Sequence, residues 1–300
     1  MKEKNSTISS LILNYNDWKT TKHLALELNE CSNITDVVIV DNCSSDDSYI
    51  KLKEIESTKI HVIKSEHNGG YGYGNNYGIK YIAENLQCTY VLICNPDVEI
   101  SNECIGKLRT TMIENPKCAI AAPIQRLYKK DGKIILPWRL ANKKEAVFSM
   151  SIAVSKVLKL DLSYNYDVLK ESELYPCDVM QGALLMADLD FIYKYGLYDE
   201  EIFLYNEEEC LAQKLKCRDK ISLLLCQEYY IHQHSVSIDK CYKSLVAKKK
   251  LQLNSRLQYL KKYYHLSKIE KTMIKIFFEF CIAEMYVIQI CCMFNNNWRK

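Results

Sequence analysis

Short, nearly unbroken apolar runs alternate along this chain with longer stretches in which apolar residues recur every three or four positions. The apolar runs lie at 8–13, 37–40, 60–63, 90–94 and 119–122. Uninterrupted hydrophobicity predicts strands that are covered on both faces. The stretches of helical periodicity lie at 18–29, 46–56, 75–85 and 102–114, with Ser44 or Ser45 and Ser101 expected as N-caps. This order predicts an α/β fold with a mostly parallel, Rossmann-like central sheet flanked by helices.

Polar clusters follow four of the predicted strands at the point where each strand ends. They are Asn14 to Asn16, Asp41 with Asn42, Asn68 to Gly70, and Asn95 to Asp97. In open parallel sheets, ligands bind outside the carboxyl ends of the strands. We therefore expect the four clusters to face one crevice.

The fourth cluster places a carboxylate at the rim of the sheet. Proline cannot donate to a strand ladder, so Pro96 ends the strand and presents Asp97 to the crevice. A carboxylate there can bind a cation. The alternative is that Asp97 caps the following helix, although Ser101 or Asn102 is better placed for that role.

A glycine-rich stretch at 67–78 contains Gly70, Gly72 and Gly74. Such a segment permits close backbone approach to a phosphate or a sugar, and the helix that follows it favours an anion. A dinucleotide fingerprint fits poorly, because the G-x-G-x-x-G spacing is absent and the segment follows the third predicted strand. A tight turn with close helix packing is the structural alternative.

The basic charge of the chain is concentrated near its C-terminal end. The net charge is +3, but residues 240–275 hold ten Lys and one Arg against the single acid Glu270. The chain has 300 residues and 48% hydrophobic content, enough for one large domain or a domain with an appendage. Its 14 cysteines show no C-x-x-C spacing, and the N-terminal residues lack a signal-peptide run. We therefore expect reduced cytosolic thiols and no zinc ribbon.

The residues after 240 predict a basic, amphipathic helical region, 241–300, beside a catalytic domain, 1–240. Residues 273–294 are strongly apolar, but Lys275, Glu279 and Glu284 interrupt them, which argues against a spanning helix. We expect peripheral membrane contact, packing on the catalytic domain, or a homodimer. No nucleic-acid module is recognisable, so no nucleic-acid partner is expected.

Six motifs occur in a familiar order over about residues 7–240. They are ILNYND, VVIVDNCSSDDS, EHNGGYGYGNNYG, LICNPDVEI, VMQGALLM and LYDEEIFLYNEEEC. This set resembles family 2 glycosyltransferases of the GT-A fold, in particular the rhamnosyltransferase-like bacterial branch. The resemblance implies inverting transfer of a sugar from a nucleotide-diphosphate donor to a saccharide or lipid-linked acceptor. It also implies Mg²⁺ or Mn²⁺ as cofactor, a role in surface polysaccharide synthesis, and a cytoplasmic enzyme at the inner face of the membrane.

Carried over by motif, the resemblance assigns residues to the donor. The nucleotide-sugar-binding positions are Asn14, Asp41, Asn68, Gly70, Asn75, Asn95 and Asp97. Asp41 matches the carboxylate that contacts the base, and Asp97 matches the last acid of the metal-binding D-x-D motif. Asn95 replaces the first acid, so one carboxylate would hold the metal while phosphate and water fill its other positions.

The same resemblance assigns the acceptor side. Gln181 and Gly182 match the start of the acceptor subsite, and Glu207 with Glu208 matches a catalytic acid pair. Glu208 is the expected general base. Three adjacent acids raise at least one pKa, which the helix dipole partly offsets. The structural alternative is an acidic first turn of a surface helix.

His232 matches a histidine that completes the metal site in some GT-A enzymes, and His234 is the neighbouring alternative. An ordinary hydrogen-bonded histidine is equally compatible with this position.

Two other functions remain open at this level. One is an inactive nucleotide-sugar-binding or scaffold protein of the same fold, which the departures at Asn95 and Cys210 permit. A nicotinamide dehydrogenase is the other, and binding of NAD would identify it.

Overall fold

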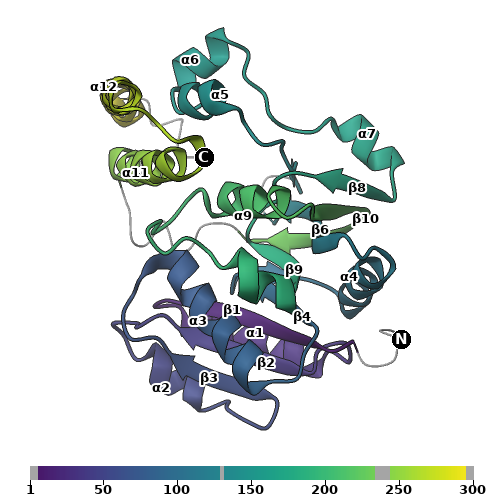
Figure 1. Ribbon diagram of the computed structural model, residues 1–300. Coiled ribbons are helices and arrows are strands. Elements are labelled where there is room, and N and C mark those ends of the chain that lie inside the picture. The colour runs from purple at the N-terminus through teal and green to yellow at the C-terminus, as the bar shows by residue number, and fades with distance from the viewer. Residues whose placement is uncertain (1–5, 129–131, 234–243, 295–300) are drawn as a thin grey trace.

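A computed structural model describes residues 6–128, 132–233 and 244–294 (Figure 1). The strands are β1 (Ile8–Asn14), β2 (Asp36–Asp41), β3 (Ile60–Lys64), β4 (Tyr90–Cys94), β5 (Val98–Glu99), β6 (Cys118–Leu127), β7 (Ile134–Ile135), β8 (Leu174–Cys177), β9 (Leu184–Asp188) and β10 (Ile221–His232). The helices are α1 (Trp18–Glu30), α2 (Ser48–Lys53), α3 (Gly70–Asn85), α4 (Asn102–Glu114), α5 (Lys143–Phe148), α6 (Ile152–Val157), α7 (Tyr166–Glu171), α8 (Leu189–Phe191), the π-helix η1 (Ile192–Gly196), α9 (Glu207–Lys216), α11 (Leu245–Tyr264) and α12 (Lys268–Phe294).

Within the described residues the strands form one sheet in the order β3-β2-β1-β4-β9-β6-β10-β5, with β7 beside β6 and β8 beside β10. Strands β3, β2, β1 and β4 are parallel, as are β6 and β10. Strand β9 enters antiparallel between β4 and β6. The α/β class, the mostly parallel sheet and all five predicted strands are confirmed.

Helices cover both faces of this sheet, because the strand residues alternate between two apolar cores. Ile8 and Ile12 of β1 pack in the core that α1 and α4 cover, whereas Leu11 packs in the core under α3 and α9. Alternate side chains of a strand point to opposite faces. The strands are therefore buried on both faces, as their uninterrupted hydrophobicity predicts, because each face packs in a separate core.

Two helix starts differ from the sequence-based expectation. Helix α3 begins at Gly70, so the glycine-rich stretch forms the first turns of a helix and not only a loop before it. Helix α2 begins at Ser48, where Oδ1 of Asp46 accepts from the backbone N–H, and the predicted caps Ser44 and Ser45 lie further upstream. The predicted cap at α4 is confirmed, because Oγ of Ser101 accepts from the backbone N–H of Cys104.

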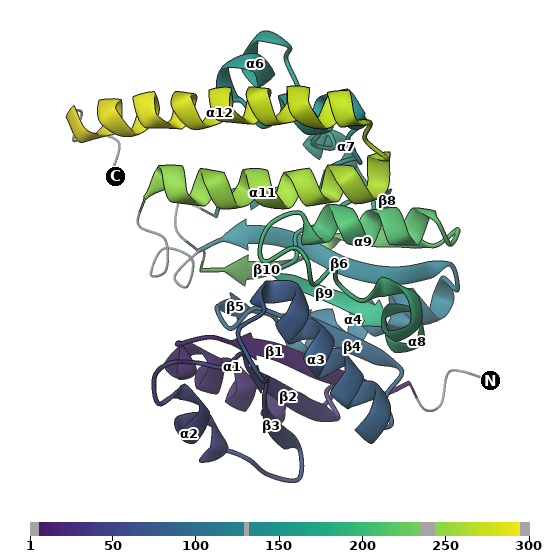
Figure 2. The ribbon, with the colours of Figure 1, turned by 60° about the vertical axis from the view of Figure 1, so that its left-hand side comes forward.

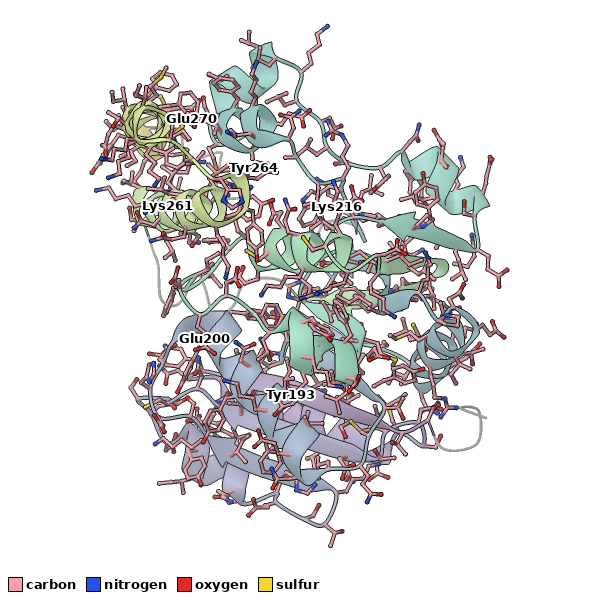
Figure 3. All side chains as sticks on the ribbon, viewed as in Figure 1. Tyr193, Glu200, Lys216, Lys261, Tyr264 and Glu270 are labelled. Carbon is pink, nitrogen blue, oxygen red and sulfur yellow. The ribbon has the colours of Figure 1, made fainter. Side chains whose placement is uncertain are left out.

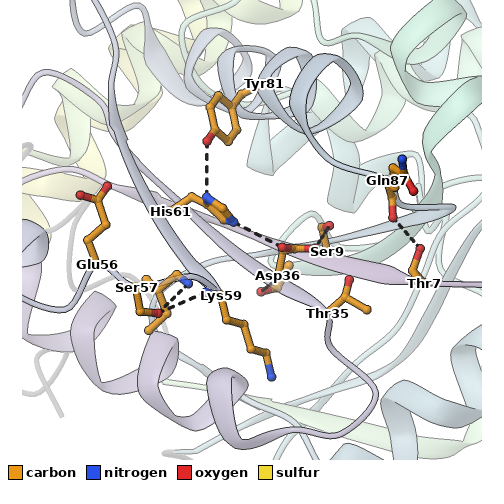
Figure 4. A network of polar contacts seen from close by, with 12 residues as sticks. Thr7, Ser9, Thr35, Asp36, Glu56, Ser57, Lys59, His61, Tyr81 and Gln87 are labelled. Carbon is orange, nitrogen blue, oxygen red and sulfur yellow. Dashed lines mark hydrogen bonds and ion pairs between the residues drawn. The ribbon is translucent and has the colours of Figure 1, made fainter.

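A polar network fixes the beginnings of the strands, at the sheet edge opposite the carboxyl ends (Figure 4). Asp36, at the start of β2, accepts from the hydroxyl of Ser9 on β1 at 3.4 Å and lies 3.3 Å from Nε2 of His61 on β3. Nδ1 of His61 faces the hydroxyl of Tyr81 at 3.4 Å. Ser9 contacts the Asp36 carboxylate and not the His61 imidazole. Ser9, His61 and Asp36 therefore lack the serine–histidine contact that activates the serine in a catalytic triad.

Helices α11 and α12 form an antiparallel hairpin on the side of α9 that faces away from the sheet (Figure 2). With α5 they enclose a third core that includes Tyr259, Phe278 and Cys281. Tyr264, at the end of α11, donates to the carbonyl of Ala141, and Glu270 of α12 pairs with Lys143 of α5 at 2.8 Å (Figure 3). The predicted domain boundary at 240/241 lies outside the described residues.

Two further findings concern the described residues as a whole. None of their helices has both the length and the hydropathy needed to cross a bilayer. Twelve cysteines in this part of the chain are free thiols, and most of them are buried.

Candidate active site

The turn at Gly182 and Ala183, just before β9, is where three distant segments meet. The hydroxyl of Tyr71 on α3 donates to the Gly182 carbonyl at 2.7 Å. The backbone N–H of Asn95, after β4, donates to the Ala183 carbonyl at 2.8 Å. The Gly182 N–H in turn donates to Oε1 of Glu208 at 3.2 Å. The structure therefore brings together the strand end that carries Asn95 and the helix that carries Glu208.

Three consecutive acids begin α9, and each has a different environment. Glu209 is buried and pairs with Arg256 of α11 at 3.1 Å. Burial, and next the charge of Glu209, raises the pKa of Glu208 to about 7, although Arg256 lowers it. Burial and the charge of Glu208 raise the pKa of Glu207 well above its usual value. The protonation of Glu208 therefore changes near neutral pH.

A small cavity of about 20 Å³ lies beside these acids, and its mainly apolar wall includes Glu207, Glu208, Tyr71 and Tyr198. Oε1 of Glu207 and the hydroxyl of Tyr198 are buried without a protein partner. Buried polar atoms almost always have a partner, and this volume accommodates about one water molecule. A water there would hydrate both atoms next to the Glu208 carboxyl.

Asp97 faces His232, because β5 pairs antiparallel with the end of β10. Oδ1 of Asp97 lies 3.2 Å from Nε2 of His232, and Gln125 of β6 faces the other ring nitrogen at 3.2 Å. The hydroxyl of Tyr230 donates to Oε1 of Gln125 at 2.8 Å, so the Gln125 amide N–H points at Nδ1. With Nδ1 accepting, Nε2 carries the proton directed at Asp97.

Tyr230 connects this chain of contacts to the acids of α9. Its pKa is raised well above the usual value by burial, and further by the negative charges of Glu208 and Asp97. The negative charges of both Glu208 and Asp97 therefore act on one buried hydroxyl.

If the Gln125 amide turns and the His232 proton moves to Nδ1, the residues present fit a divalent cation. The Asp97 and His232 side chains are 12% and 11% exposed, and adjacent ligands of an octahedral ion at about 2.1 Å lie about 3 Å apart, close to the observed 3.2 Å. The described residues contain no group of three or more His, Cys, Asp or Glu side chains that could enclose a metal. Phosphate and water oxygens would therefore supply the remaining ligands.

Asp41 and Asn14, the predicted base-contacting pair, lie side by side at the ends of β2 and β1, and both are fully buried. Asn14 donates to Oδ2 of Asp41 at 2.8 Å and accepts from the hydroxyl of Thr21 at 2.9 Å. Oδ1 of Asp41 accepts from the backbone N–H of Ser44 at 3.0 Å. Asp41 thus holds the loop after β2 in place, and the contact with a base stays a prediction.

Asn68 and Gly70 lie against this loop. The amide of Asn42 donates to Oδ1 of Asn68 at 3.1 Å and to the Gly70 carbonyl at 3.0 Å. Gly70 has φ +91°, and a Cβ atom at this position would lie 2.2 Å from the carbonyl oxygen of Phe203. Close approach of the segment that leads into α9 therefore requires glycine here. The predicted phosphate contact stays untested beside this structural role.

Two predicted residues support the site from within. Asn75 is fully buried in α3 and donates to the carbonyl of Tyr71 at 3.0 Å, while its Oδ1 has no hydrogen-bond partner among the described residues. Gln181 donates to the carbonyl of Leu136 at 2.7 Å. The roles of Asn75 toward the donor and of Gln181 and Gly182 toward the acceptor stay predictions.

Sequence reasoning missed several residues that shape the site. They are Tyr71, Gln125, Tyr198, Tyr230 and Arg256. Tyr71 stands inside the glycine-rich motif and could have been noticed there. The others act through contacts between segments distant in sequence, which no local pattern reveals.

The sheet order, the helices on both faces and the polar strand ends define an α/β protein of the GT-A fold. Its structure is similar to that of a mannosyltransferase from Pyrobaculum calidifontis solved in complex with GDP-Man and Mn²⁺. The TM-score is 0.57 at 9% identity, over 98% of this chain and 76% of the other.

Residues 9–159 match the family model described as glycosyl transferase family 2, and the chain belongs to this family. It is 29% identical over 221 residues to the low-salt glycan biosynthesis hexosyltransferase of Haloferax volcanii, covering 73% of this chain and 64% of that protein. It is 35% identical over 121 residues to the dTDP-rhamnosyl transferase RfbF of Shigella flexneri, covering 40% and 39% of the two chains. The chain thus spans less than two thirds of the length of either relative.

Proposed function

We propose that this protein is an inverting glycosyltransferase that moves a sugar from a nucleotide-diphosphate donor to a hydroxyl of a saccharide or lipid-linked saccharide. The observation that carries the proposal is the Gly182–Ala183 turn, which contacts Glu208 through the Gly182 N–H and contacts the backbone of Asn95, two positions before Asp97. A cation position and a general base within one site are what such a transfer requires. Similarity to a hexosyltransferase and a rhamnosyl transferase supports the same reaction class.

Glu208 is the proposed base. Its pKa of about 7 makes it able to take a proton from an acceptor hydroxyl near neutral pH. The Gly182 N–H holds the carboxyl at 3.2 Å and so fixes its direction. Glu207 lies beside it, and its raised pKa favours the neutral form at the start of α9.

Asp97 and His232 would hold Mg²⁺ or Mn²⁺, which would neutralise charge on the departing diphosphate. The other assigned donor residues lie on the adjacent strand ends, where Asp41 and Asn42 shape the loops that would surround the nucleotide. Single displacement at the anomeric carbon needs no covalent nucleophile from the protein. Work on surface polysaccharide, on the cytoplasmic side of the membrane, is part of the same proposal.

The direct test is release of nucleoside diphosphate from a panel of nucleotide sugars, with Mn²⁺, and with and without saccharide acceptors. Acceptor-dependent release, with inversion at the anomeric carbon of the product, is the expected result. Donor binding by calorimetry without release under any acceptor would favour a binding or scaffold protein instead. Absence of donor binding would reject both.

A further inference from the structure

Helix α12 carries an exposed apolar stripe that no described element covers. Its members are between 50% and 74% exposed and recur at heptad spacing: Ile269, Met273, Ile276, Phe280, Val287 and Ile290. The opposite side of the helix, including Ile274, Phe278 and Cys281, is buried against the third core. An apolar stripe of this length on the solvent side is unusual for a protein that stays fully in water.

Helix α6 extends this stripe into a broader face. The carboxylate of Glu284 on α12 accepts from the backbone N–H groups of Ile152 and Ala153 at 3.0 and 2.6 Å, which fixes the two helices together. Figures 1 and 2 both place α6 beside α12 at the same end of the molecule. Val157 and Leu158, at the end of α6, are 79% and 50% exposed. We call the α12 stripe together with Ile152, Val157 and Leu158 the apolar face.

Lysines surround this face. Lys156 and Lys159 flank Val157 and Leu158, and Lys268 and Lys275 lie along the edge of the α12 stripe. All four are exposed, and none of them forms an ion pair with another residue in the described part of the chain. The exposed acids nearby are Glu279 and Asp161, so the rim has an excess of positive charge.

A second copy of the chain fits this face poorly. The heptad spacing would allow α12 to pair with itself. An antiparallel pair centred near Phe280 would place Glu279 next to its own copy, and a parallel pair would place Glu279 next to Glu284. Like charges in either arrangement oppose the pairing, and α6 would remain exposed in both.

We propose that the apolar face of α12 and α6 is a docking surface for a lipid bilayer with anionic headgroups. The apolar side chains would enter the boundary between headgroups and acyl chains, and the four lysines would lie at the level of the phosphates. The face is part of the folded hairpin and does not depend on sugar transfer. It would hold the folded chain at a membrane surface.

The test is co-sedimentation of the full chain with vesicles of phosphatidylcholine that contain phosphatidylglycerol. Sedimentation with these vesicles, but not with pure phosphatidylcholine, is expected. Met273→Glu together with Val157→Asp should weaken binding by about tenfold or more, because two exposed apolar contacts become charged. Ile50→Asp is the matched control, since Ile50 is 67% exposed on the distant α2 and should leave binding unchanged.

Charge reversal tests the lysines of this surface separately from its apolar side chains. Lys156→Glu with Lys159→Glu leaves the apolar side chains intact and should weaken binding to anionic vesicles by about tenfold or more. Unchanged binding in both double variants, with far-ultraviolet circular dichroism showing native folding, would overturn the proposal. The proposal would also be overturned if the chain does not bind vesicles and instead forms a dimer, seen by sedimentation velocity, that Met273→Glu dissociates.

Discussion

The backbone N–H of Gly182 lies 3.2 Å from Oε1 of Glu208, and a Cβ atom on Gly182 would lie 2.9 Å from the same oxygen. The turn before β9 and the first turn of α9 are therefore in direct contact. The Gly182 N–H therefore orients the Glu208 carboxyl, which is the proposed base, and Gly182 itself belongs to the segment assigned to the acceptor.

Replacing Glu208 by Gln should keep donor binding and reduce transfer by about 10²–10⁴-fold, because an amide cannot accept the acceptor proton. In the unmodified protein, transfer should rise as pH increases through about 7, where Glu208 loses its proton. Nucleoside diphosphate release between pH 5.5 and 8.5, about 1.5 units either side of that pKa, measures both effects. Glu201→Gln, at an exposed position, is the control. Normal transfer by Glu208→Gln would remove Glu208 from the mechanism.

The same Glu208→Gln substitution should stabilise the folded protein at alkaline pH. The folded-state pKa lies above that of the unfolded chain, so the stabilising neutral form is fully present below about pH 4.5 and is lost as pH rises through 7. Glutamine avoids this loss, and the gain in free energy of unfolding at pH 8 should be about 1–3 kcal/mol. Urea unfolding at pH 8 and pH 4.5 checks it, and an equal gain at both values would contradict the explanation.

Arg256→Met should destabilise the protein by about 3–5 kcal/mol, because Glu209 would remain buried without its counter-charge. The variant with both Arg256→Met and Glu209→Met should recover most of that loss. Lys262→Met is a suitable control, since its half-exposed ammonium leaves Asp199 paired with Lys214. Thermal unfolding ranks the stability of the three variants and the unmodified protein. A double variant no more stable than Arg256→Met would contradict the explanation from an unpaired buried charge.

Arg256 also has a predicted signature in activity. Its positive charge lowers the pKa of Glu208, so its removal should move the pH midpoint of transfer upward. A midpoint unchanged in a folded Arg256→Met protein would limit Arg256 to a structural role.

Gly70→Ala should lower the free energy of unfolding by more than about 2 kcal/mol, because alanine is strained at φ +91° and its Cβ would meet the Phe203 carbonyl at 2.2 Å. Gly132→Ala is the matched control. Gly132 also has positive φ, +69°, but nothing lies within 4 Å of its Cβ position. Its cost should be about 1 kcal/mol. Equal losses in urea unfolding would show that backbone conformation alone matters at Gly70.

Gln125→Leu should weaken metal-dependent donor binding by about 10–100-fold while leaving metal-free binding unchanged. Ligation through Nε2 of His232 requires the proton on Nδ1, and a turned Gln125 amide can accept it. Asp97→Ala should abolish the Mn²⁺ dependence altogether, whereas Asp219→Ala, at an exposed distant position, should not. Titration calorimetry of nucleoside diphosphate, with and without Mn²⁺, measures the affinity of each variant. Unchanged Mn²⁺-dependent affinity in Gln125→Leu would mean that His232 needs no orienting partner.

The fold could be predicted further from the sequence than the site could. Uninterrupted apolar runs identify β1 to β4 and β6, because strands buried on both faces require them. The start of α3 at Gly70 was missed, since glycine has low intrinsic helix propensity and tertiary contacts with Phe203 decide the matter. The state of the acids at Glu207 to Glu209 depends on burial and on Arg256, 47 positions away along the chain, and no local pattern contains that information.

The contacts of α11 with α9 and with the loop before it limit how far this polypeptide can be shortened. The hydroxyl of Ser255 donates to the Leu204 carbonyl at 2.6 Å, next to the Arg256–Glu209 pair. A shortened version that stopped after the sheet would strip the counter-ion from the acidic triplet and release the loop ahead of it. A shortened form of this protein should therefore keep the hairpin and lose residues elsewhere.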